Sequence, residues 1–432
     1  MQKISRPGFV ATRRQAIKSI VGGAAAVLAA PYVHRAYAAD DTIRIGYIDQ
    51  FTGARANFAE RAPWVIDQIK AHTKDGLVIG GKTYAVEILS RDSQSDPNRM
   101  GSLGNELVLR EDVDLLLIAD GLAAPALEIC DQNGTPGIST ILQWEPFYAA
   151  RGSSPEKGYP WSFLFFWSGA DIIKNYTGMW DASGIEKVVG TFYEDNDFGR
   201  SFSGGMTASL QGAGFKEVPG GLFKEQVDDF SNQVAAFREG GAKIVTGLVF
   251  PQHFATFWGQ AQQAGLELEA ATIAAAFVFP SGVEVLGDQG AGMSTEIWFN
   301  RQLPFKSSLN GQSADEFCTA YEQASGKQWA QPMGYEHAIW EVAFAALKAS
   351  GNPKNRAAVR DAIADLDLDT IIGKVDFRNS SMKSVANTWV TMGQWHKNPA
   401  GSKFPYELYV TNNVTAPQVP IQKEFLPLSK FR

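Results

Sequence analysis

Residues 43–49 read Ile-Arg-Ile-Gly-Tyr-Ile-Asp. Apolar and polar side chains alternate through this stretch, which is typical of a half-buried strand. A turn at Thr52-Gly53 follows, and residues 59–69 then place apolar side chains at helical spacing. Strand, loop and helix follow one another, and this unit decides the fold because it recurs along the chain.

The unit recurs through the first 140 residues. Asp96 followed by Pro97 is typical of a helix N-cap and first helical residue. Repeated strands and helices predict a mostly parallel sheet with right-handed crossovers. The expected strands are 84–89, 113–118 and 137–140, and the expected helices begin at Pro97 and span 123–131.

A second series begins after residues 151–160, an interval rich in Pro and Gly. Two series of alternating strands and helices predict two lobes of similar build. The expected helices are 170–182, 200–212 and 254–264, and the expected strands are 187–193, 244–249, 272–276 and 294–299.

The C-terminal third has too few parallel-type strands for a third domain, so we expect it to complete the first two lobes. Its expected helices are 314–324, 335–349 and 356–366, and its expected strands are 370–377, 388–394 and 406–410.

The N-terminus has the three parts of a secretory signal. Arg13 and Arg14 lie in a basic segment, a short apolar run from Ser19 to Ala30 follows, and Ala36-Tyr37-Ala38 fits a cleavage site. The paired arginines resemble a twin-arginine signal. The alternative is a membrane anchor, but the apolar run is shorter than the ~20 residues that span a bilayer. We therefore predict export to the periplasm and cleavage near Ala38.

Cleavage would leave a strongly acidic chain. Residues 1–38 contain six of the 39 basic residues and no acid, so 33 basic residues would remain against 46 acidic ones, a formal charge of −13. This charge argues against nucleic acid or anionic lipid as a partner. Cys130 and Cys318 could pair in an oxidising compartment, and the sequence leaves this open.

Two patterns could suggest chemistry. Residues 76–83 fit the phosphate-loop pattern letter for letter, yet a helix precedes them and a strand follows, so we interpret them as a Gly-rich turn. His337 and Glu341 lie one helical turn apart, but Ile339, Trp340 and Phe344 indicate a packing helix.

Two acidic loops are also interpreted structurally. Residues 92–96 lack the glycine and distal Glu of a calcium loop, so we expect a capped loop. Asp197 is expected to cap the helix that follows the strand ending near Tyr193. The sequence shows no nucleophile motif, metal cluster or cofactor fingerprint, and we predict neither enzymatic activity nor a cofactor.

Four stretches taken in order, 43–53, 80–82, 91–97 and 193–199, resemble the periplasmic solute-binding proteins of the branched-chain amino-acid type. The resemblance implies the type I fold: α/β, two Rossmann-like lobes and three hinge crossings. It also implies a ligand in the cleft and delivery to an inner-membrane ABC permease.

The resemblance implies the following division of the chain: residues 1–38 signal peptide, 39–163 plus 300–368 N-terminal lobe, 164–299 plus 369–412 C-terminal lobe, and 413–432 C-terminal tail. We expect a monomer that depends on the twin-arginine export machinery.

Loops that leave the carboxyl ends of parallel strands are where ligands bind. In this chain they are rich in aromatic residues and poor in charge. An expected apolar wall consists of Phe51, Phe58, Trp144, Trp167, Phe198, Phe250 and Phe277. Asp120, Thr140 and Gln143 are the expected orienting polar groups, and Gly121 and Leu122 complete the candidate set.

The loops depart from the amino-acid-binding pattern of the family. Its carboxylate-binding serines are missing after Ile118, where Asp120 stands instead, and its ammonium-binding acid is expected where this chain has Phe277-Val278-Phe279. The wall therefore favours a neutral or aromatic solute. A quaternary amine or an amino acid stays possible, and a receptor-coupled sensor or an exported enzyme are alternative functions.

Overall fold

The computed structural model describes residues 41–224 and 226–432. The predicted signal, with Arg13, Arg14 and the cleavage pattern ending at Ala38, lies outside these residues. In the described part of the chain the strands form two seven-stranded sheets and one two-stranded hairpin.

The first sheet has the strand order β14-β6-β5-β4-β1-β3-β2. β1 is parallel to both β3 and β4, whereas β2 runs antiparallel to β3. The apolar run Leu115–Ile118 is wholly buried, as expected for a central strand of a parallel sheet. The strands are β1 (Thr42–Asp49), β2 (Leu77–Ile79), β3 (Lys82–Asp92), β4 (Leu115–Ile118), β5 (Gly137–Ser139), β6 (Ser162–Phe166) and β14 (Val385–Asn387).

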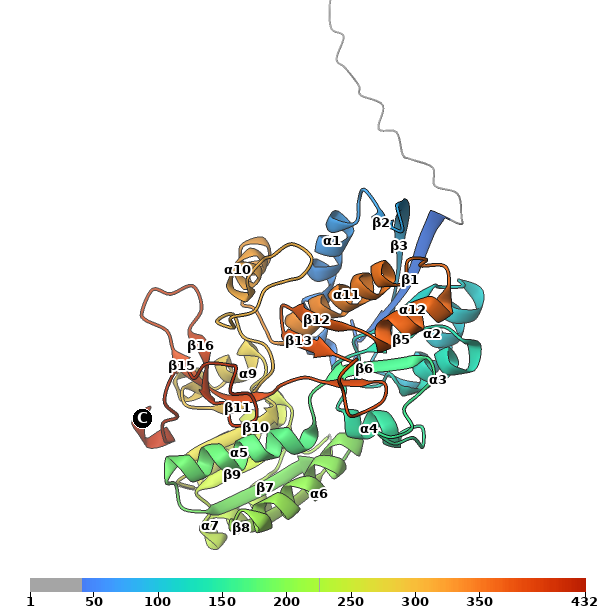
Figure 1. Ribbon diagram of the computed structural model, residues 1–432. Coiled ribbons are helices and arrows are strands. Elements are labelled where there is room, and N and C mark those ends of the chain that lie inside the picture. The colour runs from blue at the N-terminus through green and yellow to red at the C-terminus, as the bar shows by residue number, and fades with distance from the viewer. Residues whose placement is uncertain (1–40, 225) are drawn as a thin grey trace, which may run out of the picture. The chain divides into compact units, whose positions relative to one another are not determined.

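Several helices pack with this sheet or with one another beside it (Figure 1). Asp96 is the N-cap of α2, as predicted, because its carboxylate accepts from the backbone N–H groups of Asn98 and Arg99 at 2.7 and 3.2 Å. The helices are α1 (Ala62–His72), α2 (Pro97–Asn105), α3 (Ala124–Asn133), α4 (Trp144–Ala149), α10 (Ala314–Ser325), α11 (Pro332–Ala349) and α12 (Arg356–Ala364).

The second sheet has the strand order β16-β15-β11-β10-β9-β7-β8. Its strands are β7 (Val188–Glu194), β8 (Lys216–Phe223), β9 (Ile244–Val249), β10 (Ala270–Ala275), β11 (Ser294–Ile297), β15 (Thr391–Lys397) and β16 (Tyr406–Asn412). Its helices are α5 (Gly169–Ser183), α6 (Asp197–Gly212), α7 (Ser231–Gly240), α8 (Pro251–Gln263) and α9 (Pro280–Glu284).

Minor elements complete the described chain. β12 (Asp367–Thr370) and β13 (Gly373–Asp376) pair as a hairpin, where a single strand over 370–377 was expected. The short helical turns are η2 (Ala56–Phe58), η3 (Glu106–Arg110), η4 (Gly287–Gly290) and η5 (Leu428–Lys430).

The chain passes between the two sheets three times. It leaves the first sheet after β6, returns after β11, and leaves again between β14 and β15. This confirms two α/β lobes with three crossings. β14 belongs to the first sheet, so the last crossing lies between Asn387 and Thr391.

The stretch that fits a phosphate loop is a β-hairpin. β2 and β3 pair antiparallel, and Gly80 and Gly81 form the turn between them with φ of 58° and 81°. The predicted helix-to-strand turn was incomplete because the short strand β2 was missed. No helix begins after the Lys82-Thr83 pair, so the phosphate-binding arrangement is not built.

Asn196, not Asp197, is the N-cap of α6, because the Asn196 side chain accepts from the N–H of Gly199 at 2.9 Å. The expected cap at Asp197 is therefore wrong by one residue. Cys130 and Cys318 are both buried free thiols. Burial raises the pKa of both thiols, which keeps them protonated and unreactive.

Helix α11 is buried along nearly its whole length. His337 and Glu341 lie 4.0 Å apart within it, Glu341 accepts from the N–H of Ile371, and the His337 ring packs on Phe317. These contacts confirm the packing interpretation. Among the described residues, no group of three His, Cys, Asp or Glu side chains could hold a metal ion, and no helix is long and apolar enough to cross a membrane.

Candidate ligand-binding site

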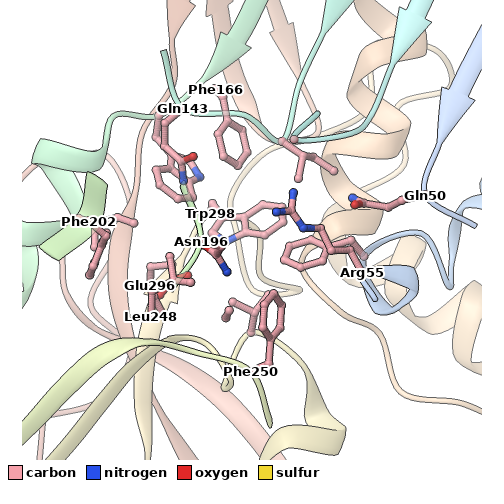
Figure 2. Close-up of a pocket in the computed structure, with 18 residues that line it drawn as sticks. Gln50, Arg55, Gln143, Phe166, Asn196, Phe202, Leu248, Phe250, Glu296 and Trp298 are labelled. Carbon is pink, nitrogen blue, oxygen red and sulfur yellow. The ribbon is translucent and has the colours of Figure 1, made fainter. Parts of the chain in front are cut away.

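A pocket lies between the two sheets, where loops from both meet (Figure 2). Its aromatic wall consists of Phe58, Phe166, Trp167, Phe202, Phe250 and Trp298. Its polar residues are Gln50, Arg55, Gln143, Asn196 and Glu296. Figure 2 shows Gln50 and Arg55 extending toward the space from one side and Asn196 from the other.

The position of the pocket follows from the parallel topology. Gln50 follows β1, and Trp167 follows β6 in the first sheet. Phe250 follows β9, and Trp298 follows β11 in the second sheet. The pocket thus lies at the carboxyl ends of strands in both sheets, which is where ligands bind in α/β folds.

Two residues of the pocket have unusual backbone angles. Ile141 has φ of 60° and Ala275 has φ of 68°, a region that side chains with a Cβ rarely adopt. The free-energy cost of this conformation is larger for Ile141 than for Ala275, because the Ile141 side chain is β-branched. Such angles persist only where the surroundings impose them, and they cluster at ligand sites.

Glu296 is a buried acid on the wall of the pocket. Its Oε2 accepts from Tyr176 Oη and Thr295 Oγ1, each at 2.8 Å. Burial raises the pKa of the carboxyl above its ordinary value. The ammonium-binding acid of amino-acid-binding family members is expected at positions 277–279, where this chain has Phe277-Val278-Phe279. The structure places one on the neighbouring strand instead.

Five of the predicted residues line the pocket: Phe58, Gly121, Gln143, Trp167 and Phe250. Phe51, Leu122 and Trp144 do not line it, because these half-buried side chains pack against the core. Phe198 belongs to α6, but its side chain lies outside the described part of the structure.

Three further predicted residues are buried and do not line the pocket. Asp120 is fully buried and accepts from Ser93 Oγ at 2.6 Å and from the N–H of Leu122 at 2.9 Å. Thr140 donates its hydroxyl to the carbonyl of Phe165 at 2.9 Å. Phe277 packs edge-on against Phe254. The polar groups of Asp120 and Thr140 are thus hydrogen-bonded within the first lobe, and neither residue lines the pocket.

Sequence reasoning missed Gln50, Arg55, Asn196, Glu296 and Trp298. Arg55 and Asn196 lie in loops at the carboxyl ends of parallel strands, where ligands were expected to bind. They were not predicted, because the sequence analysis chose mainly aromatic residues from these loops. Glu296 lies in β11, a strand that is wholly buried although three of its four residues are polar. An acid in such a strand requires a buried partner or a ligand, and that signal was available.

Two α/β lobes with a pocket between them define a two-lobed binding protein. The family model described as "Periplasmic binding protein" matches residues 42–399. The chain therefore belongs to the periplasmic binding protein family, whose members are extracytoplasmic. In a search of curated proteins, no sequence matches the chain.

Solved structures share the fold at low sequence identity. An ABC transporter substrate-binding protein from Sphaerobacter thermophilus has a TM-score of 0.70 and 18% identity, covering 89% of this chain and 99% of that chain. The leucine-binding protein LivK from Thermotoga maritima has a TM-score of 0.70 and 16% identity, covering 86% and 99%.

A third structure was solved with an aromatic ligand. It is a solute-binding protein of an ABC transporter from Rhodopseudomonas palustris BisB5, in complex with 3,4-dihydroxybenzoic acid. Its TM-score is 0.66 at 17% identity, and the match covers 87% of this chain and 99% of that chain. At these low sequence identities the comparisons establish the fold but not the ligand. The ligand must be inferred from the residues of the pocket.

Proposed function

We propose that this protein is the solute-binding component of an ABC importer, which captures a small apolar or aromatic organic solute between its lobes. The observation that supports this most is the aromatic wall of the pocket, with Phe58 from one lobe and Phe250 from the other. Rings supply apolar area and stacking with little loss of conformational freedom. A ligand that contacts both lobes stabilises their closed arrangement, which the inner-membrane permease would recognise.

The charges on the wall bear on the competing ligand, a free amino acid. Arg55 contributes a positive charge, which disfavours an ammonium group nearby. Glu296 could accept from an ammonium group, but its Oε2 already accepts from Tyr176 and Thr295. A neutral or anionic solute suits this combination better. Of the predicted residues, Phe58, Gly121, Gln143, Trp167 and Phe250 are the proposed ligand contacts.

The lobes in this proposal keep the predicted division, residues 39–163 plus 300–368 and residues 164–299 plus 369–412, except in two places. The end of β6 (164–166) and β14 (385–387) are assigned to the N-terminal lobe, because both strands lie in the first sheet. The tail 413–432 is assigned to neither lobe. We propose a monomer and a binding role without catalysis.

We also propose export through the twin-arginine pathway, with the signal cleaved near Ala38. Replacing both Arg13 and Arg14 by Lys should retain the uncleaved protein in the cytoplasm, while the native sequence yields a shorter periplasmic form. Fractionation followed by mass spectrometry of the N-terminus measures both. Periplasmic recovery of the doubly substituted protein would argue for another export route.

A thermal-shift screen tests the ligand class. The panel comprises aromatic carboxylates, aromatic amides, aromatic alcohols, aromatic amines, quaternary amines and free amino acids. A ligand at 100 times its Kd adds about 2.7 kcal/mol to stability. The proposal requires an aromatic compound to give the largest shift. It fails if leucine or valine gives the largest shift and the aromatic compounds give none.

A further inference from the structure

Two tryptophans of the pocket have an unsatisfied indole group. Trp167 and Trp298 are 3% and 1% exposed, and both line the pocket. Among the described residues, neither Nε1 atom has a hydrogen-bond partner, although both atoms are buried. Buried donors in native proteins are rarely left unpaired, so each such group needs an explanation.

Several other buried indoles of the described chain are paired. The Nε1 groups of Trp180, Trp329 and Trp395 donate to Thr272 Oγ1, to Glu407 Oε1 and to the carbonyl of Phe277, at 3.0, 3.2 and 2.8 Å. Trp340 also has an unpaired buried Nε1, but it lies in α11 and does not line the pocket. Among the described residues, Trp167 and Trp298 are thus the unpaired indoles that belong to residues lining the pocket.

The two indoles belong to one aromatic cluster. The ring centroids of Trp167 and Trp298 are 6.4 Å apart, and Phe166 contacts both, at 4.4 and 5.5 Å. Trp167 directly follows β6 and Trp298 directly follows β11, so each begins one of the crossings between the lobes.

The cluster reaches the third crossing as well. Tyr335 of α11 packs on Trp298 with a centroid distance of 5.3 Å, and its hydroxyl lies 2.7 Å from Thr388 Oγ1. Thr388 lies between β14 and β15. A ligand held by the two indoles would therefore lie beside the crossings that connect the lobes.

Building on the proposed function, we propose that Trp167 and Trp298 donate their indole N–H groups to an acceptor oxygen of the ligand, and that the site selects an aromatic solute bearing a carboxylate. An indole N–H can only donate, so an amine at this position would leave both groups unsatisfied. Arg55 on the same wall favours a carboxylate over a neutral carbonyl. Glu296 lies two residues before Trp298, and its Oε2 already accepts from Tyr176 and Thr295.

Isothermal titration calorimetry tests this with benzoate and benzylamine as matched probes. Trp167→Phe and Trp298→Phe remove the N–H donor together with the five-membered ring of the indole, so the control must make the same truncation. We expect wild type to bind benzoate and not benzylamine, each single variant to bind benzoate at least tenfold more weakly, and the double variant more weakly still. Trp340→Phe is the matched control, because it removes an unpaired indole away from the pocket, and its affinity should stay within twofold of wild type.

Melting temperatures and NMR spectra distinguish a ligand-binding role of the two indoles from a structural role. All three variants should lower the melting temperature of the unliganded protein to a similar extent, because each loses the same part of a buried ring. In 15N-labelled protein, benzoate should move two indole N–H resonances downfield, and these should be the two lost in Trp167→Phe and Trp298→Phe.

Three results would overturn the inference: benzoate binding to the double variant within twofold of wild type, tighter binding of benzylamine than benzoate, or unmoved indole resonances in benzoate-bound protein. In each case the proposed function survives if an aromatic compound still binds. If only free amino acids bind, the proposed function fails, and with it the selection of an aromatic carboxylate.

Discussion

Phe58 and Phe279 meet edge to face, with ring centroids 4.9 Å apart and an interplanar angle of 89°. Phe58 ends η2, in the loop after β1 of the first sheet, and Phe279 lies in the loop after β10 of the second. The pair therefore joins the two lobes beside the pocket. Phe58 lines the pocket, whereas Phe279 does not.

Phe279→Leu should weaken ligand binding without changing the lining of the pocket. An edge-to-face pair contributes about 0.5–1.5 kcal/mol beyond its buried area, which corresponds to about 2- to 12-fold in Kd. Because the contact holds the lobes together, the loss should appear mainly as faster dissociation. Stopped-flow tryptophan fluorescence with the tightest ligand of the screen measures both rates.

Phe230→Leu is the control for that experiment. Phe230 meets Phe223 edge to face at 5.1 Å, and both residues lie in the second lobe. This variant should lower the melting temperature and leave the affinity unchanged. Equal effects of the two variants on affinity would show that the Phe58–Phe279 pair has no special part in closure.

Gly334→Ala should destabilise the protein, although Ala favours a helix over Gly by about 1 kcal/mol. Gly334 lies in α11, and a Cβ there would overlap the ring of Phe299. Overpacking of a buried site typically costs about 1–3 kcal/mol. Urea denaturation should show a net loss of stability.

Gly204→Ala isolates helix propensity from packing. Gly204 is an exposed residue of α6, and nothing lies within 4 Å of an added Cβ. The substitution should stabilise the protein by about 0.5–1 kcal/mol. If Gly334→Ala stabilised the protein as Gly204→Ala does, the Phe299 ring would have to move aside to admit the added Cβ. The crossing beside Phe299 would then be loosely packed.

Glu407→Gln should change the pH dependence of stability. Burial raises the pKa of Glu407 to about 7 against an ordinary value of 4.5, opposed by Arg301 and aided by Glu322. The folded state thus binds more protons than the unfolded state between pH 4.5 and 7. The contribution of Glu407 to stability is present below pH 4.5 and is lost as the pH rises through 7.

Urea denaturation at pH 5 and pH 8 measures the effect. Glu407→Gln should match wild type at pH 5 within about 1 kcal/mol and exceed it at pH 8 by roughly 1–3 kcal/mol. Glu341, whose pKa burial also raises to about 7, is present in both proteins and cancels in the difference. An equal difference at both pH values would contradict the assignment.

The sequence predicted where the candidate site lies, but only some of the residues that line it. Thr140 and Gln143 leave the same strand, β5, yet Thr140 donates into its own lobe while Gln143 lines the pocket. Between them Ile141 has positive φ, which redirects the chain. Backbone angles of this kind are imposed by surrounding packing, so the local pattern does not reveal them.

The sequence by itself determined the alternation of strands and helices, the two lobes and the end of each sheet where ligands bind, because these depend on local periodicity and parallel topology. Only the tertiary structure decided which side chains meet there. Arg55, Glu296, Trp167 and Trp298 come from distant segments, and their arrangement depends on how the two sheets and three crossings pack. Since unpaired donors and acceptors exist only relative to neighbours in space, the chemistry of the pocket could be derived only from the folded chain.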